Sequence, residues 1–125
     1  MKKTTYSITK IIDIADVKNN YECYLSRSFE KNSRQTIPGN IASISGIIAL
    51  KQAVCQLFLE AVGVDVDERD IIISHKKNGA PYILKIAFSR NPETTLELSE
   101  NQIHVSISHT RKAACGLAAA QVIQK

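Results

Sequence analysis

The longest apolar stretch of this chain, residues 41–62, limits the possible folds more than any other feature. Its sequence is IASISGIIALKQAVCQLFLEAV, and its large hydrophobic residues recur at intervals of three and four, which places them on one face of an α-helix. Gly63 follows directly, and glycine is the residue that most often ends a helix. Lys51 and three other polar residues interrupt the stretch, so it favours a core helix over a membrane span.

The segments before this helix predict one strand, one further helix and a loop. Residues 6–17 are rich in β-branched residues and predict a strand. Residues 18–31 carry tyrosine, leucine and phenylalanine near helical spacing and predict a helix. Residues 32–40 contain Ser, Pro, Gly and Asn and predict a loop.

The segments after the long helix predict antiparallel strands. Residues 71–74 and 82–88 flank an Asn-Gly turn, which predicts a hairpin, and residues 91–102 are polar and predict a loop. Residues 103–108 and 113–123 predict the last two strands, although the alanines of the final segment would also suit a helix. This order of elements predicts an α+β fold, with an antiparallel sheet wrapped on the long helix.

Composition is that of one globular domain, and we expect residues 1–125 to form it. Hydrophobic residues make up 44% and charged residues 22% of the chain, which excludes disorder as its overall state. The formal net charge of +4 favours anionic partners, whereas the lack of Trp and the few aromatic residues give no stacking platform for nucleic acid. Three cysteines without a C-x-x-C spacing argue against disulfides and zinc. With no apolar run after the first lysines, we expect a cytoplasmic protein without a membrane segment.

Three separated motifs and one turn carry a resemblance to a known family. They are IIDIADV near the start, SGIIALKQAV in the long helix, VSISHT near the end, and NGAP in the hairpin. In sequence and in order they resemble the phosphopantetheinyl transferases, and most of all the small holo-acyl-carrier-protein synthase type. That type has a Gly-x-Asp-Ile strand, an Ala-Gly-Arg-Phe-Ala-Ala-Lys-Glu-Ala helix, a Ser-Ile-Ser-His-Thr corner and an Asn-Gly-x-Pro turn. The resemblance spans nearly the whole chain.

The resemblance implies an enzyme that moves the 4′-phosphopantetheine arm of coenzyme A onto a serine of an acyl carrier protein, with Mg²⁺. Breaking a pyrophosphate ester builds charge on phosphate oxygens, which a divalent cation and cationic side chains stabilise. By resemblance, Asp13 and Gln52 stand at the metal-ligand positions, and Asp13, Lys51 and Gln52 at the catalytic ones. The residues at the positions that contact coenzyme A are Lys51, Ser106, Ser108, His109 and Thr110.

Four departures from the family pattern fall on the charged side of this site. Gln52 replaces a glutamate, Ile47 an arginine, Gln56 a lysine and Ile11 a glycine. An amide oxygen can ligate magnesium but brings no negative charge, so the change at position 52 weakens the expected metal site. Nearby charged residues that could compensate are Asp16, Glu22 and Arg27.

The partners implied by the resemblance follow from charge and from family assembly. Arg27, Lys31 and Arg34 form a basic segment that suits the acidic carrier protein, although a solvated helix face has the same pattern. Family members of this size assemble as homotrimers, in which Asp13 and Lys51 would come from one chain and the VSISHT corner from its neighbour. The pathway implied is lipid biosynthesis.

Each candidate residue also has a structural alternative. Asp13 could cap a strand end, Lys51 could extend its ammonium from an amphipathic helix to water, and His109 could be a loop histidine. His75 and His104 have no carboxylate or cysteine at metal spacing and are assigned no role. The sequence therefore leaves two hypotheses: an active transferase with altered metal ligation, or a non-enzymatic relative that only binds coenzyme A or a carrier protein.

Overall fold

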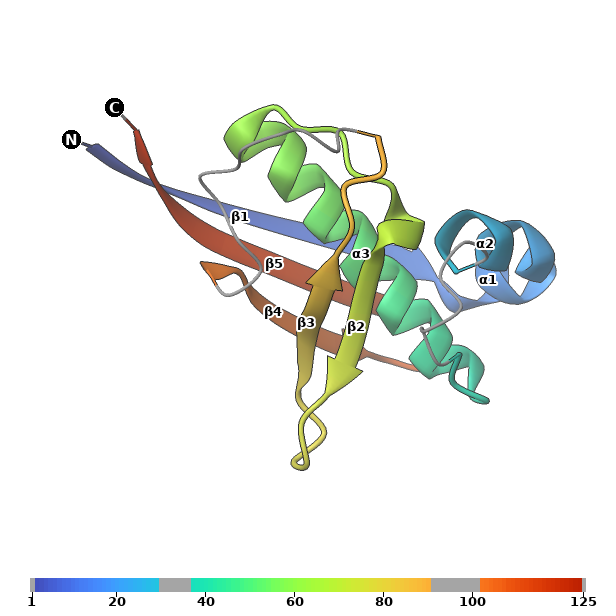
Figure 1. Cartoon of the computed structure of the whole chain (residues 1–125). Coiled ribbons are helices and arrows are strands. Elements are labelled where there is room, and N and C mark those ends of the chain that lie inside the picture. Colours follow the sequence, from blue (N-terminus) through green and yellow to red (C-terminus); the bar gives the residue numbers. More distant parts are fainter. Residues whose placement is uncertain (1, 30–36, 91–101, 125) are drawn as a thin grey trace.

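The helix α3, Ile41–Val62, lies at the centre of the structure (Figure 1). The structure is a computed structural model that describes residues 2–29, 37–90 and 102–124. Asn40 caps the start of α3 by accepting the N–H groups of Ala42 and Ser43, and Gly63 ends it with a left-handed φ of 68°. The predicted helix and its bounds are confirmed. By length and composition α3 could cross a membrane, but 67% of the window that passes this test is buried inside the structure.

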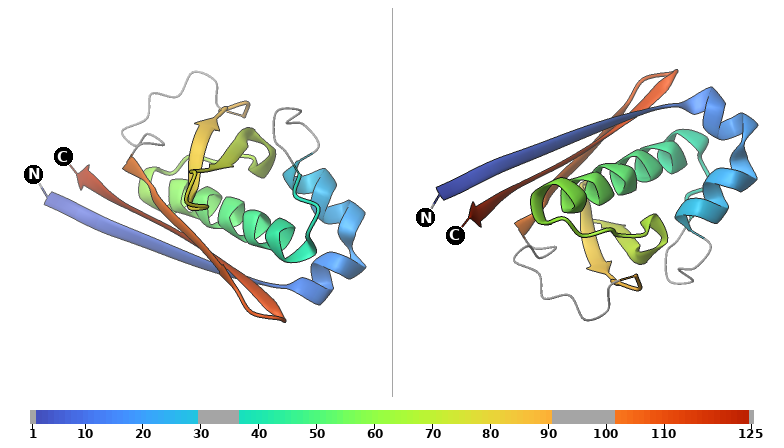
Figure 2. Two further views of the ribbon diagram at one scale, coloured as in Figure 1. Left: turned by 90° about the horizontal axis from the view of Figure 1, so that it is seen from below. Right: turned by 90° about the horizontal axis from the view of Figure 1, so that it is seen from above.

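A three-stranded antiparallel sheet covers one side of α3 (Figure 2). Its strands are β1 (Lys2–Asp13), β4 (His104–His109) and β5 (Ala113–Gln124), in the order β1-β5-β4. β1 and β5 pair along their whole length. We call the side of this sheet that is turned away from α3 the outer face.

The alanine-rich segment β5 is a strand because its small residues let α3 approach the sheet. Alternate residues, among them Ala114, Ala118 and Ala120, are buried, which is the period of a strand with one face on a core. A Cβ at Gly116 would lie 2.5 Å from the Cα of Leu50 in α3. Only glycine allows the backbone of α3 to come this close to β5. The strand predicted for residues 113–123 is confirmed.

A second sheet packs on the other side of α3. It is the hairpin of β2 (Ile71–His75) and β3 (Pro81–Ile86), and β3 also contacts β4, so that strands wrap around the helix (Figures 1 and 2). In the turn, Gly79 has a φ of 89° and donates its N–H to the Lys76 carbonyl at 2.8 Å. The α+β prediction and the hairpin are confirmed, although the second arm ends at Ile86 instead of residue 88.

The N-terminal predictions have wrong boundaries. The strand begins at Lys2 and ends at Asp13, and residues 14–17 belong to α1 (Ile14–Asn19) instead of the strand. The predicted helix over 18–31 is in fact two short helices, because the chain breaks at Asn20 before α2 (Tyr21–Ser28). A 3-10 turn, η1 (Glu68–Asp70), precedes β2.

Both predicted loops lie mostly outside the described residues. Residues 30–36 and 91–101 are not described, and residues 37–40 contain no helix or strand. The strand predicted for 103–108 runs over His104–His109, one residue later.

Candidate functional site

Asp13 is the last residue of β1 and the N-cap of α1. Its Oδ1 accepts the N–H of Ala15 at 2.9 Å, and among the described residues its Oδ2 has no partner. Asp13 pairs with Ala113, and the Ile14 N–H donates to the Lys112 carbonyl at 2.8 Å. The end of β1 therefore lies beside the turn between β4 and β5, with an exposed carboxylate.

The polar corner after β4 is closed by Thr110. Its Oγ1 accepts the N–H groups of Lys112 and Ala113 at 3.2 Å each, and its N–H donates to the Ala113 carbonyl at 2.8 Å. A threonine hydroxyl thus does what Gly, Asn or Asp usually does in a tight turn. The predicted coenzyme A residues in this corner are all exposed: Ser106, Ser108, His109 and Thr110.

The structure brings Asp13 and this corner to the same end of one sheet (Figure 2). Residues opposite each other in antiparallel strands share a face. Ser108 lies opposite Cys115, and Asp13 lies opposite Ala113, so both side chains are on the outer face. Asp13 and the corner therefore lie at one end of the sheet within a single chain.

Lys51 is fully buried within the single chain. Its Nζ donates to the Ser28 carbonyl at 2.9 Å and lies 4.3 Å from the centre of the Phe29 ring. Burial lowers the pKa of Lys51 from its usual 10.5 to about 8, and the nearby Glu68 carboxylate partly opposes this change. The ammonium would have to leave the Ser28 carbonyl to contact a phosphate.

Glu68 completes the buried cluster, and it is not among the residues predicted from the sequence motifs. Its Oε1 accepts the hydroxyl of Ser28 at 2.9 Å, and its Oε2 lies 3.8 Å from the Nε of Arg27. Burial raises the pKa of Glu68 above its usual value. Two signals were available: a lysine inside an apolar helix needs partners, and the acidic run at residues 65–70 follows that helix.

Gln52 lies on the side of α3 next to β1 and lines a pocket of about 250 Å³. The pocket also contains Lys10 of β1 and Gln56, one helical turn along α3. Asp13 is not among its lining residues, although it follows Lys10 by three positions on β1. The two expected metal ligands therefore lie on neighbouring elements but not in one pocket.

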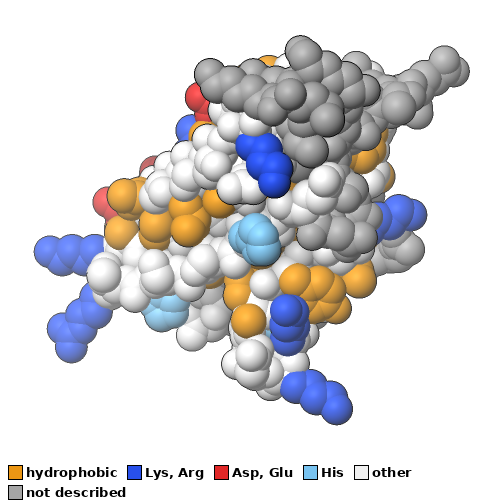
Figure 3. Space-filling view, turned by 90° about the vertical axis from the view of Figure 1, so that its left-hand side faces the viewer, with side chains coloured by type: hydrophobic (Ala, Val, Ile, Leu, Met, Phe, Trp, Pro, Cys, Tyr) orange, Lys and Arg blue, Asp and Glu red, His pale blue; other side chains and the backbone are white. Residues whose placement is uncertain are grey.

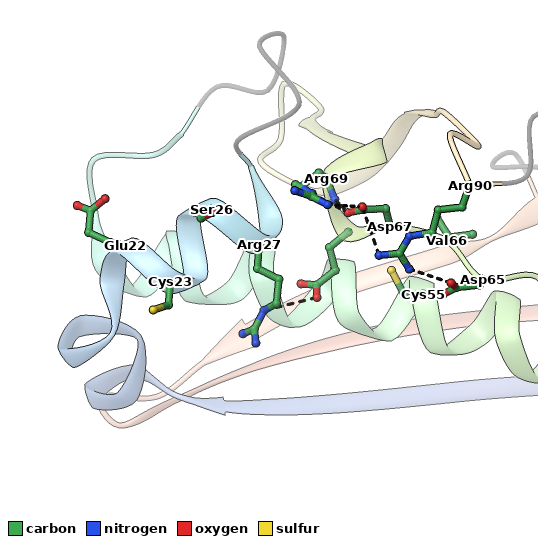
Figure 4. A pocket seen from close by; sticks show the side chains of 11 residues that line it. Glu22, Cys23, Ser26, Arg27, Cys55, Asp65, Val66, Asp67, Arg69 and Arg90 are labelled. Carbon is green, nitrogen blue, oxygen red and sulfur yellow. Dashed lines mark hydrogen bonds and ion pairs between the residues drawn. The ribbon is translucent and has the colours of Figure 1, made fainter.

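A larger pocket of about 750 Å³ adjoins this one, since both are lined by Cys55, Asp65 and Glu68 (Figure 4). Figure 4 shows Arg27, Arg69 and Arg90 in it.

Each of these arginines is paired with an acidic side chain. Asp67 accepts from Arg69 at 2.7 and 3.0 Å, and Arg90 lies 2.9 Å from Asp65 and 3.4 Å from Asp67. These hydrogen bonds, above all those from Arg69, lower the pKa of Asp67 to about 2. The acidic partners neutralise the larger pocket.

The charged residues expected to compensate for Gln52 are engaged elsewhere or lie in the larger pocket. Asp16 accepts hydrogen bonds from the side chains of Asn20 and Tyr24. The guanidinium of Arg27 stacks 4.7 Å above the Tyr24 ring, and Glu22 lines the larger pocket. These residues hold α1 and α2 together and do not reach the pocket of Gln52.

The two expected oxygen donors are separate in this chain, since Asp13 is on the outer face of the sheet and Gln52 is on α3, so a cation there needs further ligands such as substrate phosphates. Mg²⁺ takes oxygen ligands and usually keeps several waters beside one or two carboxylates and phosphate oxygens. Asp13 offers an exposed carboxylate and Gln52 an amide oxygen. Within residues 2–29, 37–90 and 102–124, no three or more His, Cys, Asp or Glu side chains are grouped as metal ligands. A metal held by protein groups alone does not fit this arrangement.

The fold is that of solved holo-acyl-carrier-protein synthases. Such a structure from Chronobacterium ammoniagenes superposes with a TM-score of 0.76 at 13% identity, covering 98% of this chain and all of that one. The Bacillus anthracis synthase, solved with coenzyme A (3′,5′-ADP), gives 0.62 at 20% identity, over 94% and 96% of the two chains. The Helicobacter pylori synthase with coenzyme A gives 0.59 at 24% identity, over 90% and 97%.

This chain has the phosphopantetheinyl transferase fold. The resemblance expected from the sequence motifs is confirmed. A curated relative, the holo-acyl-carrier-protein synthase of Bacillus subtilis, is 34% identical over 80 residues, which are 64% of this chain. The match spans about half of that relative, 54% of its length. No family model matches the sequence.

Proposed function

We propose that this chain, as one domain over residues 1–125, transfers 4′-phosphopantetheine from coenzyme A to a serine of an acyl carrier protein. The observation that carries the proposal is the exposed corner of Ser106, Ser108, His109 and Thr110 beside Asp13, on a phosphopantetheinyl transferase fold. Solved relatives with this fold contain coenzyme A. The proposal assigns the corner and Lys51 to coenzyme A binding.

The reaction is a displacement at phosphorus. The serine oxygen of the carrier forms a bond to the phosphorus that bears the pantetheine arm, the bond from that phosphorus to the bridging oxygen breaks, and adenosine 3′,5′-bisphosphate leaves. Charge grows on the phosphate oxygens during this step, so hydroxyls and cationic side chains aimed at them lower the barrier. The serine proton must also leave, and because the Gln52 amide is not basic, the proton passes to water or to a phosphate oxygen of the leaving adenosine 3′,5′-bisphosphate.

The proposed metal is Mg²⁺, held by Asp13 and Gln52 together with the phosphates of coenzyme A. It would neutralise charge on the phosphate oxygens. With a carboxylate only at Asp13, the chain needs a higher Mg²⁺ concentration than a site with two carboxylates. The exposed second oxygen of Asp13 supports this assignment.

The carrier-protein surface that we propose is the segment predicted from Arg27, Lys31 and Arg34, of which the structure describes Arg27 at the end of α2, while Lys31 and Arg34 lie outside the described residues. Arg27 is partly exposed there, its side chain 54% accessible, and the whole chain carries a net charge of +4. Figure 3 shows the opposite side of the molecule from α2, where Lys and Arg side chains also project outward and Asp and Glu side chains appear only at one edge. A basic surface attracts an acidic carrier and raises its association rate.

A homotrimer is the assembly that we propose. The outer face of the three-stranded sheet carries no other described element, as Figure 2 shows, and Ile11 near the end of its edge strand β1 is 72% exposed. An exposed isoleucine on an uncovered sheet face favours burial against another chain. We also propose that the protein is cytoplasmic and acts in lipid biosynthesis. The three free cysteines support the cytoplasmic compartment.

The second candidate function is coenzyme A or carrier-protein binding without transfer. It is favoured by Gln52 and Gln56, which place two amides where the family pattern has charges. Two measurements separate the candidates: calorimetric titration with coenzyme A, and intact mass spectrometry of an apo carrier protein incubated with enzyme, coenzyme A and Mg²⁺. A mass gain of one phosphopantetheine, absent when the carrier serine is replaced by alanine, supports the transferase. Binding without a mass gain on any of several carriers supports the second candidate.

A further inference from the structure

The smaller pocket contains a lysine that has no role so far. Lys10 lies on β1 with its side chain on the α3 side of the sheet, and lines this pocket with Gln52 and Gln56. Its partner across the strands is Gly116, against which the backbone of α3 packs directly, so Lys10 lies where β1 adjoins the helix. Lys10 is half-buried, so its stem is held by the protein while its ammonium can reach the pocket.

The acidic side chains of this pocket already have partners. Asp65 pairs with Arg90 at 2.9 Å. Glu68 accepts from Ser28 and lies near Arg27. Lys10, by contrast, forms no ion pair within 4 Å with any residue of the described ranges.

The other lysine near the site is not available in the same way. The Lys51 ammonium donates to the Ser28 carbonyl and is fully buried. Gln56, where the family pattern has a lysine, is neutral. Among the described residues that line the pocket, Lys10 is thus the one cation without an acidic partner.

We propose that Lys10 binds the pyrophosphate of coenzyme A in this pocket and so supplies, from β1, the positive charge that position 56 lacks. The inference rests on the proposed function, because it takes the coenzyme as ligand. An ammonium and two carboxamides are suitable donors for phosphate oxygens. In the family pattern this charge comes from position 56 on the long helix, whereas here it would come from Lys10 on the neighbouring strand, and both positions line the same pocket.

The test compares coenzyme A binding by four variants. Lys10→Met removes the charge but keeps the apolar stem, and Lys10→Arg keeps the charge. Lys3→Met is the matched control, since Lys3 is an exposed lysine of the same strand. The fourth variant combines Lys10→Met with Gln56→Lys and tests whether a cation on α3 restores coenzyme A binding. Calorimetry gives the Kd for coenzyme A and for 3′-dephospho-coenzyme A, which keeps the pyrophosphate but lacks the 3′-phosphate.

We expect Lys10→Met to raise the Kd for both ligands by about 10-fold or more, which is the effect of losing one charged hydrogen bond. Lys10→Arg and Lys3→Met should bind like the wild type, and Gln56→Lys should restore most of the loss. Unchanged binding by Lys10→Met would overturn the inference, and so would a loss seen with coenzyme A but not with the dephospho form. If the wild type binds coenzyme A through Lys10 but transfers nothing, only the transferase proposal fails. If the wild type does not bind coenzyme A, both fail.

Discussion

The buried ammonium of Lys51 connects three elements of the molecule. It lies in α3, donates to the last carbonyl of α2 through Ser28, and is close to Glu68 of η1. A positive charge at the end of a helix is favourable because the last carbonyls there have no partner within the helix. Lys51 therefore holds α2, which carries the proposed carrier-protein surface, against the core.

The burial of Lys51 predicts a specific pH dependence of stability. The folded protein releases the lysine proton near pH 8, whereas the unfolded chain keeps it to about pH 10.5, so the unfolded chain binds more protons in between. The free energy of unfolding contributed by Lys51 must therefore rise with pH through this window, by at most about 1.4 kcal/mol per pH unit.

Lys51→Met removes this dependence. The difference in free energy of unfolding between wild type and variant, measured by urea titration from pH 7 to 10, should shift in favour of the wild type above pH 8. Cys55, whose pKa burial raises to about 12, is present in both proteins and cancels. A difference that stays constant across this range would show that the ammonium is not buried in solution.

Single residues show what the sequence could and could not predict about the site. Asp13 and Thr110 were found because their motifs are local, and the structure places them at one end of the sheet. The partners of Lys51 were missed, since Ser28 and Glu68 are distant from it in sequence. A lysine in an amphipathic helix has the same pattern whether its ammonium reaches water or a buried carbonyl.

At the scale of elements, the contact between β5 and α3 determines how the sheet packs. Gly116 faces the backbone of Ala49 and Leu50 with no room for a Cβ. Main-chain atoms of a helix cannot rotate away as a flexible side chain can, so a larger residue must separate the helix from the sheet.

Gly116→Ala should therefore lower the free energy of unfolding by about 3 kcal/mol or more, at the upper end of the usual cost of overpacking. Gly39→Ala is the control, because nothing lies within 4 Å of a Cβ there, and its effect should be below about 1 kcal/mol in either direction. Chemical denaturation measures both. Equal stabilities of the two variants would contradict the close contact between helix and strand.

The boundary between β1 and α1 shows why the end of the first strand was predicted wrongly. Ile14 and Val17 are β-branched and buried, so composition alone extends the strand through them. The Asp13 carboxylate accepts the N–H of Ala15 and starts a helix at this point instead. The long helix was predicted to the residue because its period, its cap and its final glycine all agree.

At the scale of the whole molecule, the outer face of the three-stranded sheet is the surface available for assembly. Ile11→Lys places a charge on this face, near the end of β1, and should convert the proposed trimer to monomers, because an unpaired charge buried in an interface is costly. Leu84→Lys is the control, since Leu84 is an exposed hydrophobic residue of β3 in the other sheet.

Size-exclusion chromatography with light scattering measures the mass of each species. The wild type and Leu84→Lys should have three times the mass of one chain, and Ile11→Lys the mass of one. A wild type that is monomeric at micromolar concentration would contradict the proposed assembly, and with it a site shared between chains.

The most direct test of the proposed transferase is intact mass spectrometry of an apo carrier protein, incubated with coenzyme A, increasing Mg²⁺ and either the wild type or Gln52→Glu. The transferase proposal predicts that the wild type adds one phosphopantetheine to the carrier. It also predicts that Gln52→Glu lowers the Mg²⁺ concentration for half-maximal rate by about 10-fold, because a carboxylate replaces a neutral amide beside the metal. A carrier whose mass stays unchanged with both proteins, at any Mg²⁺ concentration, would contradict the claim that this fold still performs the transfer.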